Sequence, residues 1–425
     1  MINTAHLSVE TAPPISIPFR FLVTAPLFGV LFAVVVILQG ESLWVSRWNP
    51  QLIGALHLIN IGFLMMTISG VLFQMLPVIG GLQFPQLKPL ATLLHFSLTG
   101  GTLLLFGGLG WGISGLMSAG FWLLLVGLAP YLLLLLWMLF TVNEVPEWLR
   151  LLRFIAPFLL LLGGLGLMLL LGWSNPEVQL MRQMTDVHAI WGLGGWFTLL
   201  LMATSFQLIP MFQVTPDFQP WVKRWLIPMI ALLLISWGGS IIMGKAEGQW
   251  LLLLVFVGVV YYGGTTFRLL QQRKRKIFDT TVAFWQLSLA AMVVAGVWMI
   301  VLLVTASPIP GWIVPVWIFM VLIPMLLGMV LKIAPFLVFL HLQQQMIRNP
   351  QQMGNLAALP NLFQILPTPW GRYLLWGYLV TMSLFLLASW IPLLYHIAGI
   401  GLLLLFSWLV WIVYHCYHVY NTRAS

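Results

Sequence analysis

The sequence predicts an all-α, polytopic (multi-pass) membrane protein with twelve transmembrane helices. Of its 425 residues, 61% are hydrophobic and only 6% are charged, whereas about a quarter of the residues in a soluble domain are charged. A helix that spans the bilayer needs about 20 apolar residues. Twelve stretches reach this length: 18–39, 51–80, 88–110, 113–142, 151–173, 182–212, 219–243, 248–271, 278–305, 311–340, 371–390 and 392–418.

A short motif that ends in proline recurs and divides the chain into three similar parts. The motif reads FQMLP, FQLIP and, in weaker form, LKIAP, and it ends at Pro77, Pro210 and Pro335. The prolines are 133 and 125 residues apart, and near-equal spacing of this kind indicates internal repeats. We therefore predict a single membrane domain over residues 1–425, built from three four-helix repeats at about 18–142, 151–271 and 278–418.

The basic residues predict that both ends of the chain are cytoplasmic. With the N-terminus inside, fourteen of the eighteen Lys and Arg residues fall in cytoplasmic segments, three fall in external loops, and Lys332 lies within a span. Cytoplasmic loops of membrane proteins carry such an excess. We therefore attribute the net charge of +9 to the orientation of the chain in the membrane and expect no nucleic-acid partner. Residues 1–17 lack the positive start and cleavage site of a signal peptide. The run Arg273–Lys276 is expected to lie against anionic lipid.

Histidines are the main candidates for chemistry inside the spans. The one cysteine, Cys416, excludes a thiolate cluster, and no carboxylate lies deep in a span, which argues against a proton-coupled transporter. His57 and His188 lie 20 and 22 residues before the repeated prolines, at similar depth. A neutral imidazole suits a haem iron or a copper ion. The alternative is that each imidazole bonds only to a backbone carbonyl or to water.

Other residues near these depths have less specific patterns. His95, in the inner half of the third helix, and His396, near the outer end of the last, are further candidate cofactor ligands. His341, at the end of the tenth helix, is predicted to be solvated. Glycines beside the two main histidines either allow close packing of helices in lipid or leave room for a flat cofactor. These glycines are Gly62, Gly70, Gly192, Gly194 and Gly195.

The chain resembles the haem-copper oxidase catalytic subunit (subunit I) superfamily, in topology over residues 18–418 and in sequence only within the repeated segments. The resemblance implies three four-helix arcs around a pseudo-threefold axis. It matches His57 to the second-helix ligand of the low-spin haem and His188 to the sixth-helix copper ligand. The chain departs from the family in three places: 311–340 has no histidine, 221–244 lacks the pair that completes the copper site, and Gly192 replaces a tyrosine.

With these departures, the resemblance implies a haem-binding relative that lacks a complete binuclear centre. One haem b would be held by His57 and His188, or with one partner from His95 or His396, and copper is not expected. Reduction of oxygen or nitric oxide by the family mechanism is not supported, because ligands are missing. The implied roles are electron transfer, quinol contact or gas sensing in the respiratory chain of a bacterial-type inner (plasma) membrane, with the lipid bilayer and quinol or other respiratory subunits as partners. The alternative is a cofactor-free transport scaffold, or an assembly or accessory partner of a respiratory complex.

Overall fold

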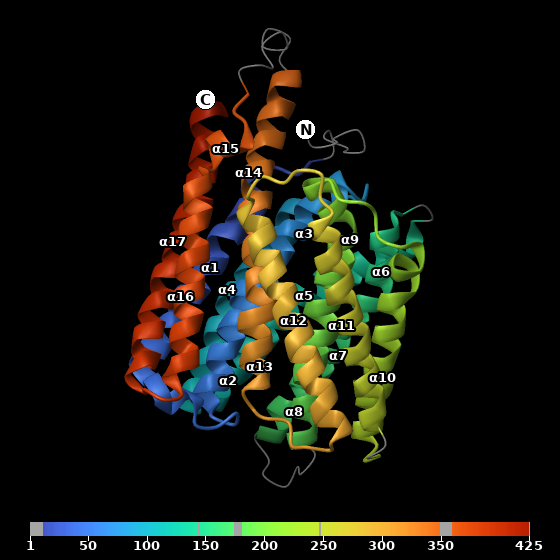
Figure 1. Ribbon diagram of the computed structural model, residues 1–425, viewed down its shortest axis with the longest axis vertical. Coiled ribbons are helices and arrows are strands. Elements are labelled where there is room, and N and C mark those ends of the chain that lie inside the picture. Colours follow the sequence, from blue (N-terminus) through green and yellow to red (C-terminus); the bar gives the residue numbers. More distant parts are fainter. Residues whose placement is uncertain (1–11, 143–144, 174–180, 246–247, 349–358, 425) are drawn as a thin grey trace. The chain divides into compact units, whose positions relative to one another are not determined.

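The computed structural model describes residues 12–142, 145–173, 181–245, 248–348 and 359–424, and in these segments it contains helices and no strands (Figure 1). In the described part, twelve helical segments are long and apolar enough to cross a membrane. This confirms the predicted all-α, multi-pass class. The segments are Ser16–Trp44, Pro50–Val78, Leu87–Trp111, Ser114–Thr141, Glu147–Trp173, Gln183–Gln213, Val222–Ile242, Gln249–Gln271, Thr280–Val304, Ile313–Arg348, Thr368–Ala388 and Leu393–Arg423.

The chain forms two compact units. The terminal unit combines Ala5–Tyr131 with Leu327–Ser425, and most of the central unit is Leu132–Leu326. The division falls inside helix α5 (Ser114–Thr141) and inside helix α14 (Ile323–Arg348). The prediction of a single membrane domain with three repeats stays a prediction.

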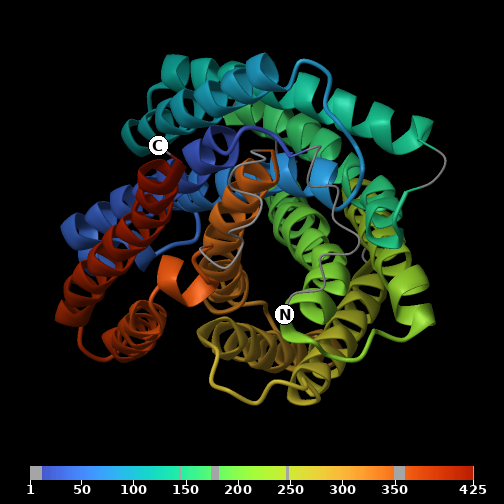
Figure 2. The same ribbon diagram turned by 90° about the horizontal axis from the view of Figure 1, so that it is seen from above.

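In the terminal unit, α17 packs along α1 and α16, and it is the dark red helix in Figure 2. Helix α2 begins where the sequence favours a start, because the Asn49 side chain accepts a hydrogen bond from the backbone N–H of Gln51 at 3.0 Å and Pro50 occupies the first position. Besides parts of α5 and α14, the helices of this unit are α1 (Ser16–Gln39), η2 (Gly40–Trp44), α2 (Pro50–His57), η3 (Leu58–Met65), α3 (Met66–Val78), α4 (Leu87–Trp111), α15 (Leu362–Ile365), α16 (Thr368–Ala388) and α17 (Leu393–Ala424).

In the central unit, polar side chains bond backbone carbonyls of neighbouring helices. The Trp191 indole donates to the Leu234 carbonyl at 2.8 Å, and the Ser288 hydroxyl donates to the Val321 carbonyl at 2.6 Å. Such bonds help to hold helices together in lipid, where apolar surface alone gives little driving force. Besides parts of α5 and α14, the helices are α6 (Glu147–Ile155), α7 (Pro157–Trp173), α8 (Met181–Ile190), η4 (Trp191–Thr198), α9 (Leu199–Gln213), η5 (Val222–Leu226), α10 (Ile227–Ile242), α11 (Gln249–Gln271), α12 (Thr280–Val304), α13 (Ile313–Val316) and η7 (Trp317–Leu322).

The three spans that carry the proline motif share a local widening of the helix. Each contains a π-helical segment, η3, η4 or η7, whose last residue lies 12, 12 or 13 residues before the motif proline. Segments of π-helix are rare in proteins, and those that occur often lie at functional sites. The same spans are also the most enclosed. In their most apolar stretch, 78%, 78% and 72% of the residues are buried, against 22–50% in the other nine spans. The repeated motif therefore marks the three helices that bury most of their surface inside the protein.

Two of these spans also end in matching aromatic groups. In the terminal unit, Phe73 makes edge contacts with Phe84 and Tyr131, with ring centroids 5.2 and 5.4 Å apart. In the central unit, Phe206 makes the same contacts with Phe218 and Tyr262, at 4.8 and 6.2 Å. Edge contacts of this kind stabilise a packed core beyond the burial of area.

The hydroxyls of these two tyrosines differ in their surroundings, which gives a matched test. The Tyr262 hydroxyl bonds the Ser205 hydroxyl at 2.7 Å, whereas the fully buried Tyr131 hydroxyl has no partner among the described residues. The residue that corresponds to Ser205, one position before the motif phenylalanine, is Leu72, which cannot accept a hydrogen bond. We expect Tyr262→Phe to lower the free energy of unfolding by about 1 kcal/mol, and Tyr131→Phe to leave it unchanged or raise it. Denaturant titration in detergent micelles would check both, and equal losses would contradict the difference in bonding.

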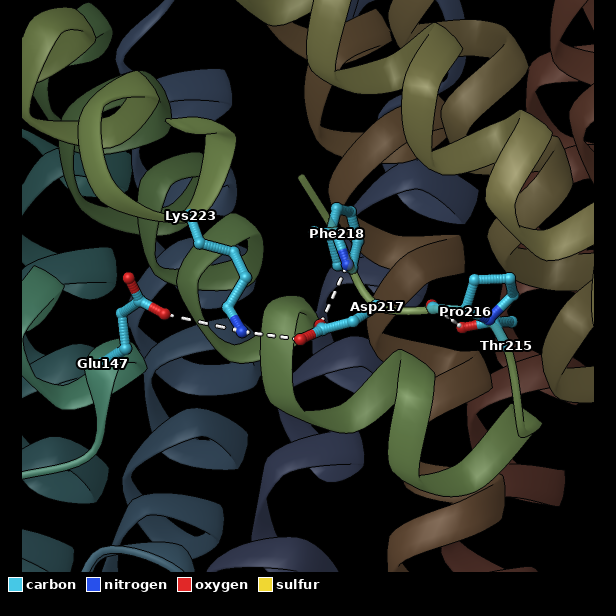
Figure 3. Close-up of polar contacts among 6 residues, drawn as sticks. All are labelled: Glu147, Thr215, Pro216, Asp217, Phe218 and Lys223. Atoms are coloured by element: carbon cyan, nitrogen blue, oxygen red, sulfur yellow. Dashed lines mark hydrogen bonds and ion pairs between the residues drawn. The ribbon is translucent and has the colours of Figure 1, made fainter. Parts of the chain in front are cut away.

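A small ion-pair group fixes the loop between α9 and η5. Lys223 lies between two carboxylates, 2.9 Å from Asp217 and 3.4 Å from Glu147 (Figure 3). The second oxygen of Asp217 accepts from the backbone N–H of Phe218 at 2.9 Å. These groups are partly or largely exposed, and such pairs contribute less than about 1 kcal/mol. The group therefore orients the loop beside α6 and contributes little to overall stability.

Candidate functional site

His57 is held in the form that binds a metal. It is the last residue of α2 and directly precedes η3. Its Nδ1 lies 2.7 Å from the carbonyl oxygen of Ile53, one turn earlier. Because a carbonyl can only accept, Nδ1 must carry the proton, and in the neutral ring Nε2 then carries the lone pair. Metal-binding histidines commonly have this arrangement, in which a backbone carbonyl fixes the ring.

His188 is followed by glycines that have different surroundings. A methyl group on Gly195 would overlap the ring of Phe158, so this glycine serves close packing of α7 against η4. A methyl group on Gly192 would have its nearest neighbour, Leu162, at 3.6 Å, and one on Gly194 would have Leu234 at 3.8 Å. These two positions therefore need no glycine for packing.

The space at Gly192 lies on the face of the helix that His188 occupies, because residues one turn apart are neighbours on a helix surface. In the terminal unit, Gly62 holds the repeat position of Gly195 and is packed in the same way, because a methyl group there would overlap Phe28. A methyl group on Gly70 would lie 2.6 Å from Phe21. A methyl group would thus fit beside His188 in ordinary contact with Leu162, whereas one at Gly62 or Gly70 would not fit. His57 belongs to the terminal unit and His188 to the central unit, and their pairing across one iron stays a prediction.

His95 and His396 both contact α1, at two separate levels. His95 Nε2 lies 3.0 Å from the Thr24 hydroxyl, and His396 Nδ1 donates to the Ile37 carbonyl at 2.6 Å. Thr24 and Ile37 are 13 residues apart, which is about 20 Å along a helix at 1.5 Å per residue. These two histidines therefore do not share one iron.

His396 also closes the end of α1. Gly40 has a positive φ of 54°, a conformation that glycine adopts without strain, and a methyl group there would overlap His396 at Nε2. The imidazole thus packs on the turn that ends the helix while Nδ1 bonds the Ile37 carbonyl. This gives His396 a structural role that the sequence does not reveal.

The prediction that His341 is solvated is wrong. Its side chain is buried, with 6% exposed. Nδ1 lies 2.8 Å from the Leu337 carbonyl and Nε2 lies 2.9 Å from the Pro13 carbonyl. The ring ties the segment before α1 to α14, an interaction between residues 328 positions apart.

The described residues contain no group of three or more His, Cys, Asp or Glu side chains arranged to hold a metal ion. A haem iron differs from such a site because the porphyrin supplies four nitrogens and the protein supplies only one or two axial ligands. His57 has the tautomer for that role, and His188 lies three residues before a π-helical segment. The π-helical segments beside these histidines could not be predicted from the sequence.

The helices and their apolar composition define a multi-pass α-helical membrane protein. No protein-family model matches the chain, and no curated protein has a similar sequence.

Proposed function

We propose that this protein binds one haem b in a bacterial-type inner (plasma) membrane and is a relative of the haem-copper oxidase catalytic subunit. The observation that carries the proposal is the position of His188, three residues before a widened helical segment in which close packing does not require glycine at 192 and 194. His57 supports it, because the Ile53 carbonyl orients its ring with Nδ1 protonated. In this proposal His188 would hold the haem iron, and His57 keeps the predicted role of a second ligand.

The proposed arrangement in the membrane follows the family. The twelve helices would form three four-helix arcs with both chain ends in the cytoplasm. Fourteen basic residues fall in the predicted cytoplasmic segments and three in the predicted external loops, which supports this orientation. The repeated π-helical segments and the high burial of the second, sixth and tenth spans support the threefold arrangement.

Electron transfer is the role that this ligand set favours. A bound haem supplies one-electron redox chemistry. A haem held by two imidazoles would favour electron transfer over the binding of a substrate such as oxygen. The chain's own contribution is to orient the two rings and to exclude water. Quinol or another respiratory subunit would then be the electron partner, and gas sensing would require one imidazole to dissociate.

Haem content tests the proposal directly. The protein is expressed with haem supplementation, purified in detergent and examined by the pyridine haemochrome spectrum. We expect about one haem b per chain, and a loss of about tenfold or more in haem retention for His57→Ala and for His188→Ala, because an axial imidazole is the main bond between protein and iron. His415→Ala, which changes a histidine near the end of α17, serves as the control. A wild-type protein without haem under these conditions refutes the proposal.

A cofactor-free scaffold or an accessory partner of a respiratory complex is the second candidate. The specific observation in its favour is that His95, His396 and His341 each form hydrogen bonds that join separate parts of the chain. These histidines act in packing, and His57 and His188 would then do the same. Co-purification with oxidase subunits, in a preparation without a haem spectrum, would support this candidate.

A further inference from the structure

A ladder of polar side chains joins α1 to α4 in the terminal unit. The Arg20 guanidinium donates through Nη1 to the Thr92 hydroxyl at 3.1 Å. One turn further along both helices, the Thr24 hydroxyl lies 3.0 Å from His95 Nε2. The Thr92 hydroxyl itself donates to the Lys88 carbonyl at 2.9 Å, so it presents an oxygen lone pair to Arg20. The ladder fixes where the guanidinium lies.

Arg20 has no carboxylate counter-ion among the described residues. Its Nε is buried without an acceptor, and the structure shows no ion pair for it in the described segments. The one described acidic residue of the terminal unit, Glu41, is 21 residues further along the chain, which is about 30 Å along a helix. A cation at the edge of an apolar span is costly without a partner. An anion bound from outside the described residues would therefore stabilise this guanidinium.

The surroundings of Arg20 indicate the chemistry of that anion. A guanidinium offers five N–H donors in a planar fork that matches phosphate oxygens. Lys88, exposed and one turn before Thr92 in α4, places a second positive charge on the same helix face. Beside Thr92 and His95, α4 also exposes Leu93 and Phe96, 37% and 64% accessible. Two cations next to exposed apolar side chains fit an anion that carries hydrocarbon.

The depth of Arg20 fits a lipid headgroup. Arg20 is four residues after the start of α1 at Ser16, which is about 6 Å along the helix axis. An arginine at this level reaches the headgroup region with its charged end while its stem stays among apolar groups. The positive-inside pattern assigns this end to the cytoplasmic leaflet, which is rich in anionic lipid.

We propose that Arg20, Lys88 and Thr92 bind the phosphate of an anionic phospholipid at the exposed seam between α1 and α4. Arg20 donates to the phosphate through the terminal N–H groups that Thr92 does not engage, Lys88 adds charge, and Thr92 holds the guanidinium in place. The bond between Thr24 and His95 keeps the two helices together beside the site. Leu93 and Phe96 contact the acyl chains.

Lipid retention in native mass spectrometry tests this site without reference to haem. The full-length protein is released from nanodiscs that contain equal amounts of phosphatidylglycerol and phosphatidylcholine. We expect one phosphatidylglycerol to stay bound to the wild type, and Arg20→Gln to weaken its retention by about tenfold, as expected for loss of a charge-assisted bond to phosphate. Arg224→Gln, a basic residue of the central unit near the start of its span, is the matched control and should retain the lipid.

Three outcomes overturn the proposal. Equal retention by Arg20→Gln and Arg224→Gln shows that Arg20 does not form the site. Equal retention of the zwitterionic lipid shows that the negative charge is not recognised, and displacement by millimolar inorganic phosphate shows that the ligand is a free anion. If Arg20→Gln does not fold, Lys88→Gln and Thr92→Val replace it, since Lys88 and Thr92 are exposed; retention by both variants at the wild-type level then counts against the site.

Discussion

Gly195→Ala is expected to destabilise the protein by about 1–3 kcal/mol, the usual cost of overpacking a well-filled core. The added methyl group would overlap the ring of Phe158. That ring is fully buried and makes an edge contact with Trp191 at 6.1 Å, so it has no space into which it could move. Thermal or denaturant unfolding in detergent measures the loss. Unchanged stability would show that α7 and η4 are less closely packed than the structure indicates.

Gly192→Ala is the matched control three positions earlier, and it separates packing from cofactor binding. Its methyl group would meet only Leu162, at 3.6 Å, so the apoprotein should unfold as the wild type does. If a haem lies beside His188, the same methyl group occupies space next to the porphyrin and should weaken haem retention by about tenfold, in line with the cost of overpacking. Full haem content in Gly192→Ala would show that the helix face beside His188 does not hold the macrocycle.

The twelve spans could be predicted from sequence because bilayer thickness imposes a length of about 20 apolar residues. The ends of the spans were less predictable. The tenth span was expected to end at residue 340, but it continues to Arg348. Gln343, Gln344 and Gln345 lower the hydrophobicity, yet glutamine is a good helix former. Loss of hydrophobicity marks the edge of the membrane and does not by itself end a helix.

The candidate site could be predicted only in part. His57 and His188 stand out because imidazoles are rare in apolar spans, but the widened segments after them have no sequence signature that distinguishes a π-helix from an α-helix. The glycines were ambiguous for the same reason. Both Gly62 and Gly192 follow a candidate histidine by about one turn, and only their neighbours distinguish them: a methyl group would overlap Phe28 at the first and make an ordinary contact with Leu162 at the second. His341 was misjudged because its partner, Pro13, is remote in sequence.

Thr198→Val is expected to lower the free energy of unfolding by about 2–4 kcal/mol, because it removes one hydroxyl that serves two buried groups. The Thr198 hydroxyl donates to the Leu193 carbonyl at 2.7 Å and accepts from the Trp317 indole N–H at 3.0 Å. Both side chains are buried, with 1% of Thr198 and 8% of Trp317 exposed. Valine keeps the shape of threonine and leaves the indole and the carbonyl without these bonds.

The bond joins the last residue of η4 to the first residue of η7, so within the central unit it connects the π-helical segments of two of the three motif spans. Thr198→Ser retains the hydroxyl and removes only a methyl group, and it should lose about 1 kcal/mol or less. Denaturant titration of both variants in the same detergent makes the comparison. Equal losses would mean that packing of the methyl group, and not the shared hydroxyl, stabilises the junction. A large loss for valine alone would show that the shared hydroxyl holds the widened segments in place. One of them, η4, begins three residues after His188.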